Sequence, residues 1–181
     1  MSSMVIRPAT AADAATIVGL VRELAEFERA PASSIKLTEA DIRRDGFGPN
    51  PRFEALLAEI DGAVEGLAVF FPNWSTWEGR AGLYVEDLYV RPRARRRGVG
   101  RRLVAEIAAL AAARGCVRVD LNVLDWNPAR AFYERLGVGE MRDWRPYRLT
   151  GDAIARLAAD AAPPPATPPG RRSPRRRSSS G

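Results

Sequence analysis

The sequence predicts one α/β domain in which a mixed, twisted and mostly antiparallel sheet carries helices on both faces. Strand-like and helix-like segments follow one another in the order β-α-α-β-β-β-α-β-α-β. Three consecutive strands in the middle of this order exclude a simple doubly wound parallel sheet. With 181 residues, 46% of them hydrophobic, the chain is also long and apolar enough to bury one core.

The N-terminal half is predicted to hold a strand, two helices and a hairpin. The strand is MVIRPAT, residues 4–10, and two Thr-x-x-Asp capping boxes then open helices at Thr10 and Thr38. The first helix places five apolar side chains on one face: Ile17, Leu20, Val21, Leu24 and Phe27. FEALLAEI and VEGLAVFF, joined by Asp61-Gly62, form the hairpin, because Asp-Gly suits a type I′ turn.

The C-terminal half is predicted to alternate strands with helices. GLYVEDLYV, residues 82–90, is a strand, and a helix with one apolar side follows within Gly98–Gly115. VRVDLNVL is the next strand, and Asn127-Pro128 is typical of the start of a helix, here ARAFYERLG. WRPYRL, residues 144–149, is expected to be a last strand, and GDAIARLAAD is expected to be a closing helix.

The charge is unevenly placed along the chain. Residues 1–160 are predicted to form the domain, and residues 161–181 a disordered tail rich in Pro, Ser and Arg. The net charge of +6 is concentrated in this tail, which has five arginines and no acidic residue, so the domain itself is nearly neutral. The tail is either a basic arm that touches nucleic acid or another polyanion, or a solvated appendage.

Several absences in the composition narrow the chemistry. The sequence has no histidine, which excludes Ser-His-Asp and Cys-His nucleophiles and removes the usual ligand of catalytic zinc, so we expect no metal. Its one cysteine, Cys116, cannot form an internal disulfide and is expected to be inert core at the start of a buried strand. No run approaches the ~18 apolar residues of a membrane span, and MSSMVIRPAT lacks a secretory signal pattern. We therefore expect a cytoplasmic protein that does not enter a membrane.

A glycine turn lies between the strand 82–90 and the helix that follows it. Residues 95–100 read RRRGVG, an R-x-x-G-x-G pattern. Glycines let a backbone approach a ligand closely, the free N–H groups of a first helical turn bind anions, and nearby arginines add charge. The turn is neither a Walker A loop, because no Gly-Lys-Ser/Thr follows, nor a dinucleotide-binding G-x-G-x-x-G. By itself it is either a phosphate site or a plain tight turn into a helix.

The turn and its surroundings resemble a known family. VEDLYV before the turn, the R-x-x-G-x-G pattern itself and LDWNPARAFYERLG one strand later are similar to motifs of the GCN5-related N-acetyltransferase (GNAT) superfamily. VIRPATAAD, LTEADIRRDGFG, FEALLAE and FFPNWSTWEGRAGLYVEDLYV narrow the resemblance to its diamine acetyltransferase branch, which includes spermidine/spermine and thialysine N-acetyltransferases. The likeness runs from about Val5 to Leu149.

The resemblance implies a GNAT fold that binds acetyl-CoA and an amine together, so that the amine attacks the thioester directly. Backbone donors of three residues would hold the pantetheine and polarise the thioester: Leu88, Tyr89 and Val90. The pyrophosphate is assigned to Arg95, Arg96, Arg97, Gly98, Val99, Gly100 and Arg101, and the CoA arm to Asn127, Pro128, Ala129 and Arg130. The branch commonly forms homodimers, so a homodimer is also implied.

The resemblance assigns catalysis to Glu86 and Tyr133. An aliphatic ammonium has a pKa near ~10.4, so some group must take its proton at neutral pH, and without histidine a carboxylate is the candidate. Glu86 would be the general base or a proton-path residue, and Asp87 a second acid near the amine. Adjacent side chains of a regular strand point to opposite faces, so both reach one cleft only if a β-bulge intervenes, as is usual in the superfamily. Tyr133 would protonate the departing thiolate or hydrogen-bond to it.

The acceptor amine is assigned to Phe27, Glu28, Glu86, Asp87 and Trp77, while Trp74 and Trp126 either wall the same channel or simply pack. The predicted function is acetyl transfer from acetyl-CoA to a primary amine of a small substrate: a diamine, a polyamine or a lysine-like amino acid such as thialysine. The alternatives are acetylation of a protein or peptide amine, a nucleic-acid-associated protein acting through the tail, and a CoA-binding module without catalysis.

Overall fold

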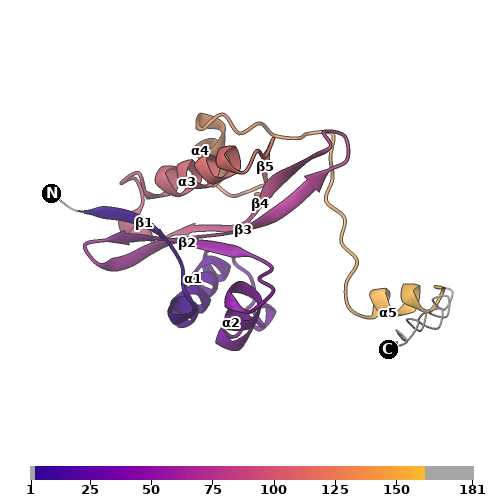
Figure 1. The fold of residues 1–181 in the computed structure, drawn as a ribbon. Coiled ribbons are helices and arrows are strands. Elements are labelled where there is room, and N and C mark those ends of the chain that lie inside the picture. Colours follow the sequence, from indigo (N-terminus) through magenta and orange to yellow (C-terminus); the bar gives the residue numbers. More distant parts are fainter. Residues whose placement is uncertain (1–2, 162–181) are drawn as a thin grey trace, which may run out of the picture. The chain divides into compact units, whose positions relative to one another are not determined.

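The computed structural model describes residues 3–161, which fall into two compact units that divide between Gly139 and Glu140. The first unit is a five-stranded sheet in the order β1-β2-β3-β4-β5, with helices on both of its faces (Figure 1). This arrangement confirms the predicted fold class. Apart from Ala161, the tail predicted for residues 161–181 lies outside the described residues.

The sheet is mixed and mostly antiparallel. Its strands are β1 (Met4–Pro8), β2 (Glu54–Ile60), β3 (Ala63–Ser75), β4 (Arg80–Val90) and β5 (Val119–Leu121). Neighbours from β1 to β4 pair antiparallel, and β5 alone runs parallel to β4. Asp61 (φ 51°) and Gly62 (φ 81°) both have positive φ between β2 and β3, which confirms the predicted hairpin turn.

Two pairs of helices cover the sheet. α1 (Ala14–Phe27) and α2 (Glu39–Phe47) lie on one face, and α3 (Val99–Ala113) and α4 (Ala129–Arg135) lie on the other (Figure 1). The predicted capping boxes are both formed: at Thr10, before the short 3-10 helix η1 (Ala11–Asp13) that leads into α1, and at Thr38, before α2. Two further 3-10 turns are η2 (Ala32–Ser34) and η3 (Pro92–Ala94).

The alternation of side chains along the strands builds one apolar layer on each face. Toward α1 and α2 the sheet contributes Leu57, Leu67, Val69 and Tyr89. Toward α3 it contributes Leu56, Phe70, Leu83 and Val85. Burying an aliphatic or aromatic side chain of this size stabilises the fold by roughly 1.5–3 kcal/mol, so the two layers hold the strands in register.

β5 is shorter than predicted. The expected strand covered residues 117–124, but only Val119–Leu121 pair with β4. Cys116 therefore precedes the strand rather than beginning it, although its half-buried side chain packs against the α3-side core as expected.

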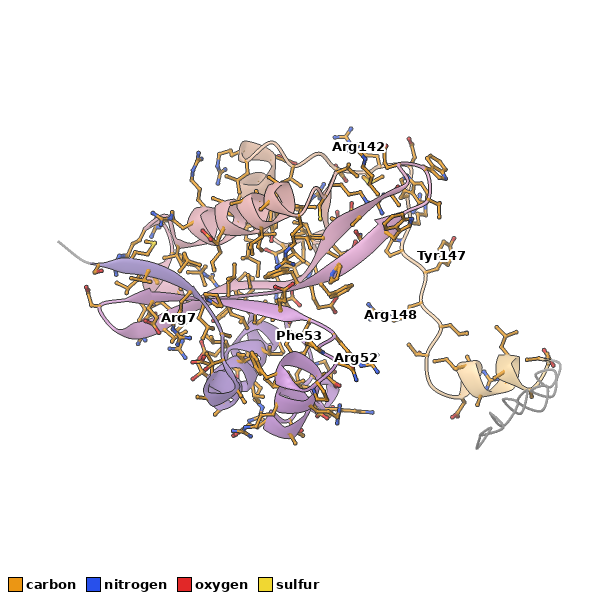
Figure 2. All side chains as sticks on the ribbon, viewed as in Figure 1. Arg7, Arg52, Phe53, Arg142, Tyr147 and Arg148 are labelled. Atoms are coloured by element: carbon orange, nitrogen blue, oxygen red, sulfur yellow. The ribbon has the colours of Figure 1, made fainter. Side chains whose placement is uncertain are left out.

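The second unit contains α5 (Asp152–Ala158), which confirms the predicted closing helix. The strand predicted at residues 144–149 is wrong, since these residues form no strand. A strand needs a hydrogen-bonded neighbour, and Pro146 has no N–H to donate. Figure 2 shows Tyr147 and Arg148 on the extended chain before α5. Within residues 3–161, no helix has the length and apolarity to cross a bilayer.

Candidate active site

The acidic pair Glu86-Asp87 lies at a β-bulge in β4, as predicted. β3 pairs with β4 as Val69↔Asp87 and then as Phe70↔Val85, so Glu86 is an extra residue without a partner across the strands. The bulge reverses the alternation of β4. Val85 and Phe70 pack toward α3, whereas Asp87 shares the α1 face with its partner Val69. Regular alternation would have put Asp87 on the opposite face.

β4 and β5 separate directly beside the bulge. Their parallel pairing consists of Leu83↔Val119, Tyr84↔Asp120 and Val85↔Leu121, and it ends there. Within residues 3–161, residues 86–90 of β4 thus have a strand neighbour on the β3 side alone. The N–H groups on the other side of this segment have no strand partner, as at the edge of a sheet.

The direction of the backbone donors follows from one hydrogen bond. Arg91 N–H donates to the carbonyl oxygen of Glu65 in β3 at 2.9 Å. Donor direction alternates along an antiparallel strand, so Tyr89 N–H also points to β3, and the N–H groups of Leu88 and Val90 point to the open edge. Of the three predicted backbone donors, Leu88 and Val90 are therefore available to a ligand and Tyr89 is not.

The predicted anion turn joins β4 to α3. Arg96 (φ 61°) and Gly98 (φ 83°) are both left-handed, and α3 starts at the next residue, Val99. The N–H groups of the first turn of α3 have no acceptor within the helix, so they can bind an anion. Gly100 serves a different purpose, because a Cβ there would lie 3.3 Å from the Phe132 ring of α4. Glycine at this position lets α3 and α4 pack closely.

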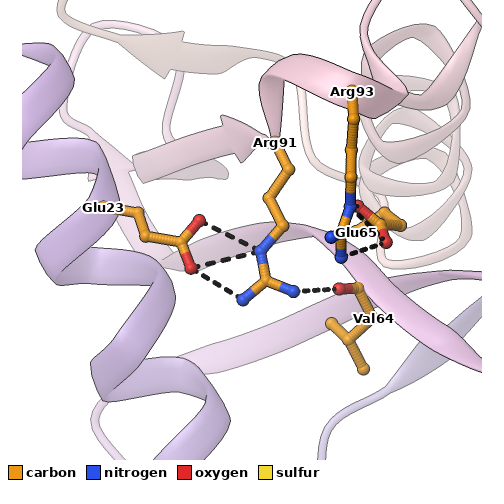
Figure 3. A network of polar contacts seen from close by, with 5 residues as sticks. All are labelled: Glu23, Val64, Glu65, Arg91 and Arg93. Atoms are coloured by element: carbon orange, nitrogen blue, oxygen red, sulfur yellow. Dashed lines mark hydrogen bonds and ion pairs between the residues drawn. The ribbon is translucent and has the colours of Figure 1, made fainter.

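Two arginines before the turn are held by carboxylates, as Figure 3 shows. Arg91 Nη2 lies 2.7 Å from Glu23 Oε1, and Arg91 Nη1 donates to Val64 O at 2.8 Å. Arg93 Nη2 lies 2.7 Å from an oxygen of Glu65, a side chain that is almost fully buried. The hydrogen bond from Arg91 lowers the pKa of Glu23. These pairs join α1, β3 and η3, so they fix the position of the turn.

Arg95 also holds the turn in place. Its Nε donates to Val90 O at 2.9 Å, its backbone N–H donates to Pro92 O at 3.2 Å, and its guanidinium lies 4.4 Å from the centre of the Phe27 ring. The arginines of the predicted set whose side chains are exposed are Arg96, Arg97 and Arg101. Arg95 therefore has partners within the protein. An anion at this turn would be bound by the later residues of the turn.

Beside the open part of β4, the charge of Glu28 acts on two other ionisable side chains, Asp87 and Tyr133. Burial, together with the negative charges of Glu86 and Glu28, raises the pKa of Asp87 to about 6. Burial also raises the pKa of Glu28. The pKa of Tyr133 rises to about 12, again through burial and the charge of Glu28. Since Glu28 acts on both other groups, α1, β4 and α4 bring these side chains together, whereas Glu86 itself is exposed.

Tyr133 lies in apolar surroundings. It is 9% exposed and lines a cavity of about 180 Å³. The other walls are mostly aliphatic and come from β4, α3, β5 and the segment after α4: Val85, Leu88, Ile107, Leu121 and Val138. Such surroundings disfavour the phenolate, so the hydroxyl keeps its proton at neutral pH and can act as a hydrogen-bond donor.

The start of α4 confirms the predicted cap. Asn127 Oδ1 accepts a hydrogen bond from Ala129 N–H at 2.9 Å, and Pro128 precedes the first helical residue. Arg130 Nη1 lies 2.8 Å from Asp125 Oδ1 and also donates to Asp125 O. Asn127 and Arg130, two of the four residues assigned to the CoA arm, therefore have side-chain partners within the protein, which orient the beginning of α4.

Contacts between aromatic rings and guanidinium groups connect α1 with the segment before α4. The Phe27 and Trp126 ring centres are 6.1 Å apart, and the Arg29 guanidinium lies 4.5 Å from the centre of the Trp126 ring. Arg95 covers the other ring, Phe27. Arg29 is not among the residues predicted for the site, although a basic residue directly after the assigned pair Phe27–Glu28 is a signal that could have pointed to it.

Trp74 and Trp77, the other tryptophans considered for the amine channel, lie at the far end of the β3–β4 hairpin. Trp74 and Trp77 are 63% and 88% exposed. Along β4, Asp87 is seven residues beyond Arg80, which corresponds to roughly 20 Å of extended chain. The structure therefore does not place Trp77 beside Glu28 and Asp87 of the same chain.

The separation of β4 from β5, the bulge in β4 and the turn before α3 are together typical of enzymes that transfer acyl groups. The sequence matches a family of such enzymes. The model of the Acetyltransferase (GNAT) family matches residues 20–138. The chain belongs to this family and is an acetyl-CoA-dependent N-acetyltransferase, as predicted.

Similar proteins agree with this assignment. The thialysine N-epsilon-acetyltransferases of Sus scrofa and Mus musculus are 36% and 38% identical to this chain over 170 residues, covering 87% of this chain and 99% of each relative. A solved aminoglycoside N-acetyltransferase in complex with CoA has a TM-score of 0.67 at 21% identity, covering 82% of this chain and 96% of that one. The first two relatives support an amine acceptor, and the solved structure shows the shared fold.

Proposed function

We propose that the chain acetylates the side-chain amine of a small lysine-like amino acid, with the reacting amine between Asp87 and Tyr133 and with Glu28 nearby. The observation that carries this proposal is the half-buried Asp87 carboxyl, with a pKa of about 6, beside the open part of β4. Similarity to thialysine N-epsilon-acetyltransferases over 87% of the chain favours an amino acid over a diamine or a polyamine.

The residues at the open edge fit acetyl-CoA. The N–H groups of Leu88 and Val90 would hold the pantetheine, and the first turn of α3 with the exposed Arg96 and Arg101 would hold the pyrophosphate. Acetyl-CoA supplies the acetyl group as a thioester, so the amine nitrogen bonds to the carbonyl carbon as the carbon–sulfur bond breaks. The backbone donors are fixed before binding, which favours charge development on the carbonyl oxygen.

Asp87 would take the proton of the acceptor ammonium, directly or through water. Its pKa of about 6 lies between its ordinary value of 3.8 and the ~10.4 of an aliphatic ammonium. This shift of about two pH units makes proton transfer easier by about 3 kcal/mol, while the carboxylate stays mostly ionised at neutral pH. The resemblance assigned the base to Glu86; we propose Asp87 because it is the less exposed member of the pair and its pKa is raised. The exposed Glu86 would pass the proton to solvent.

Tyr133 would donate a hydrogen bond to the departing sulfur. Its pKa of about 12 lies above that of a thiol, ~8.5, so complete proton transfer to a free thiolate is uphill by about 5 kcal/mol. A hydroxyl held protonated in an apolar cavity can still stabilise the negative charge that develops on sulfur. This role needs no ionisation of the tyrosine.

The experiment that tests the proposal is CoA release from acetyl-CoA by the purified full chain with thialysine, lysine, ornithine, putrescine, spermidine and a basic peptide. We expect turnover with the amino acids and a large loss in Asp87→Asn. Turnover with the peptide alone, or no turnover with any amine, would contradict the proposed acceptor. A homodimer and a cytoplasmic location stay predictions, and light scattering tests the first of them.

A further inference from the structure

An acidic and a basic residue follow each other at the end of α1. Glu28 follows the last residue of α1, and Arg29 adopts a left-handed conformation (φ 60°), which is uncommon for a residue other than glycine. Two backbone hydrogen bonds stabilise this turn: Arg29 N–H to Glu26 O at 3.0 Å and Ala30 N–H to Ala25 O at 2.9 Å. The direction in which Arg29 leaves the helix is therefore fixed by the backbone.

The guanidinium of Arg29 is held by a ring rather than by an acid. It lies 4.5 Å from the centre of the Trp126 ring, a distance typical of a cation–π contact. Within residues 3–161, no carboxylate forms an ion pair with it, in contrast to Arg91 and Arg93. A guanidinium that lies over a ring and has no acidic partner keeps N–H donors that suit a carboxylate.

This guanidinium belongs to the surroundings of the acceptor site. Trp126 packs against Phe27, whose ring centre is 6.1 Å away, and Phe27 directly precedes Glu28. Glu28 in turn lies close enough to Asp87 and Tyr133 for its charge to act on both. An acceptor with its reacting amine at Asp87 and Tyr133 would therefore meet Glu28 and Arg29 with its other end.

A pair of opposite charges fits only some of the possible acceptors. The far end of an α-amino acid carries an ammonium and a carboxylate, which Glu28 and Arg29 complement one for one. The far end of a diamine or a polyamine carries only ammonium groups, which Glu28 attracts and Arg29 repels. The contrast between these acceptors depends on Arg29, because Glu28 attracts the ammonium groups of both.

We propose that Arg29 determines acceptor specificity by binding the carboxylate of an amino-acid acceptor, with Trp126 holding its guanidinium in place. This inference rests on the proposed function and adds the residue that separates amino acids from amines. Arg29 would form a charge-assisted hydrogen bond with the amino acid and repel the diamine. Together these effects should favour the amino acid about 10- to 100-fold in kcat/KM.

The test compares acceptors that differ only in a carboxylate: L-lysine with cadaverine and L-ornithine with putrescine. In the wild-type enzyme, kcat/KM should favour the amino acid of each pair. Arg29→Gln should lower this ratio about 10- to 100-fold, mainly through the KM of the amino acid, with the KM of acetyl-CoA unchanged. Arg29→Lys should retain part of the preference because it retains the charge. Arg22→Gln, at an exposed arginine of α1, is the matched control and should leave the ratio as in wild type.

The outcomes separate this inference from the proposed function. Turnover with an unchanged ratio in Arg29→Gln, or a wild-type preference for the diamines, overturns the role of Arg29 and leaves the enzyme an amine acetyltransferase. If none of the four acceptors is turned over, the proposed function fails. Calorimetric binding of L-lysine and cadaverine in the presence of CoA then tests the role of Arg29 by itself. Wild-type protein should bind lysine more tightly than cadaverine, and Arg29→Gln should not.

Discussion

The two halves of β4 have different surroundings although they belong to one strand. Residues 80–85 lie between β3 and, from Leu83, β5, and Leu83 and Val85 are buried in the α3-side core. Residues 86–90 have β3 alone as a strand neighbour in the described part of the chain, begin with the bulge and place Asp87 in surroundings that oppose its ionisation. The first half stabilises the fold, and the second half leaves backbone donors and an acid available for chemistry. The reactive site begins where strand pairing ends.

The largest effect is expected from Asp87→Asn in the open half. If Asp87 takes the ammonium proton, the amide should lower kcat/KM by about 10²- to 10⁴-fold at neutral pH. Steady-state CoA release with the best amine measures it. Glu86→Gln, at the exposed neighbour, is the control and should lose much less. Equal losses in the two variants would contradict the distinction between the half-buried Asp87 and the exposed Glu86.

The same variant should be more stable than the wild type. The folded-state pKa of Asp87, about 6, lies above its ordinary 3.8, so ionisation costs stability as pH rises through this range, and the full cost is present above pH 6. Asp87→Asn removes the cost and should gain up to about 3 kcal/mol at pH 7.5 and little near pH 4. Urea unfolding at both pH values measures the difference. A gain of the same size at both would contradict the titration of Asp87.

In the paired half, Leu83→Ala should act on stability and not on chemistry. Leu83 is fully buried, so its truncation should lower the free energy of unfolding by about 2–5 kcal/mol. The folded variant should keep kcat and both KM values within about twofold, because Leu83 lies before the bulge. Urea unfolding and steady-state kinetics below the unfolding transition check the two parts. A large loss of kcat in a fully folded variant would break the contrast between the halves.

Tyr133→Phe should lower kcat by about 10- to 100-fold, because a hydrogen bond to the developing thiolate is lost. The KM of acetyl-CoA should change little, since the bond forms mainly in the transition state. Rapid-quench measurement of the acetyl-transfer step isolates this effect from product release. An unchanged rate constant for that step would show that Tyr133 only packs against the cavity.

The smallest effects are expected at the turn, where two kinds of arginine can be compared. Arg96→Gln and Arg101→Gln should each raise the KM of acetyl-CoA by a few-fold, and less so at high salt, because an exposed charge facing pyrophosphate is screened. Arg93→Gln should instead destabilise the fold, because it leaves the buried Glu65 without its partner. If Arg93→Gln raised the KM of acetyl-CoA with no loss of stability, the distinction between arginines that bind the anion and arginines that stabilise the fold would be wrong.

Local sequence patterns were enough to predict most of the fold. The capping boxes at Thr10 and Thr38 and the Asp61-Gly62 turn act through groups a few residues apart, so they can be predicted from sequence. The strand expected at residues 144–149 failed because a strand forms only against a partner, which a local pattern does not specify.

The site was harder to predict because it depends on contacts between distant residues. Regular alternation separates Glu86 from Asp87, and only the resemblance to a family predicted the bulge that puts Asp87 on the α1 face. The contact of Arg29 with Trp126 joins the end of α1 to the segment before α4, so no short motif contains both residues. Arg95 belongs to a recognisable motif, but its contacts with Val90 O and Phe27 appear only in the folded chain.

The most direct test of the proton acceptor is the pH dependence of kcat/KM with a lysine-like acceptor. Asp87 must be ionised to accept a proton, so kcat/KM should fall as pH drops below an apparent pKa near the value of about 6. This acidic limb should be absent from the residual activity of Asp87→Asn and present in Glu86→Gln. If the limb persists in Asp87→Asn, or lies near pH 4 in the wild type, then Asp87 is not the group that takes the proton.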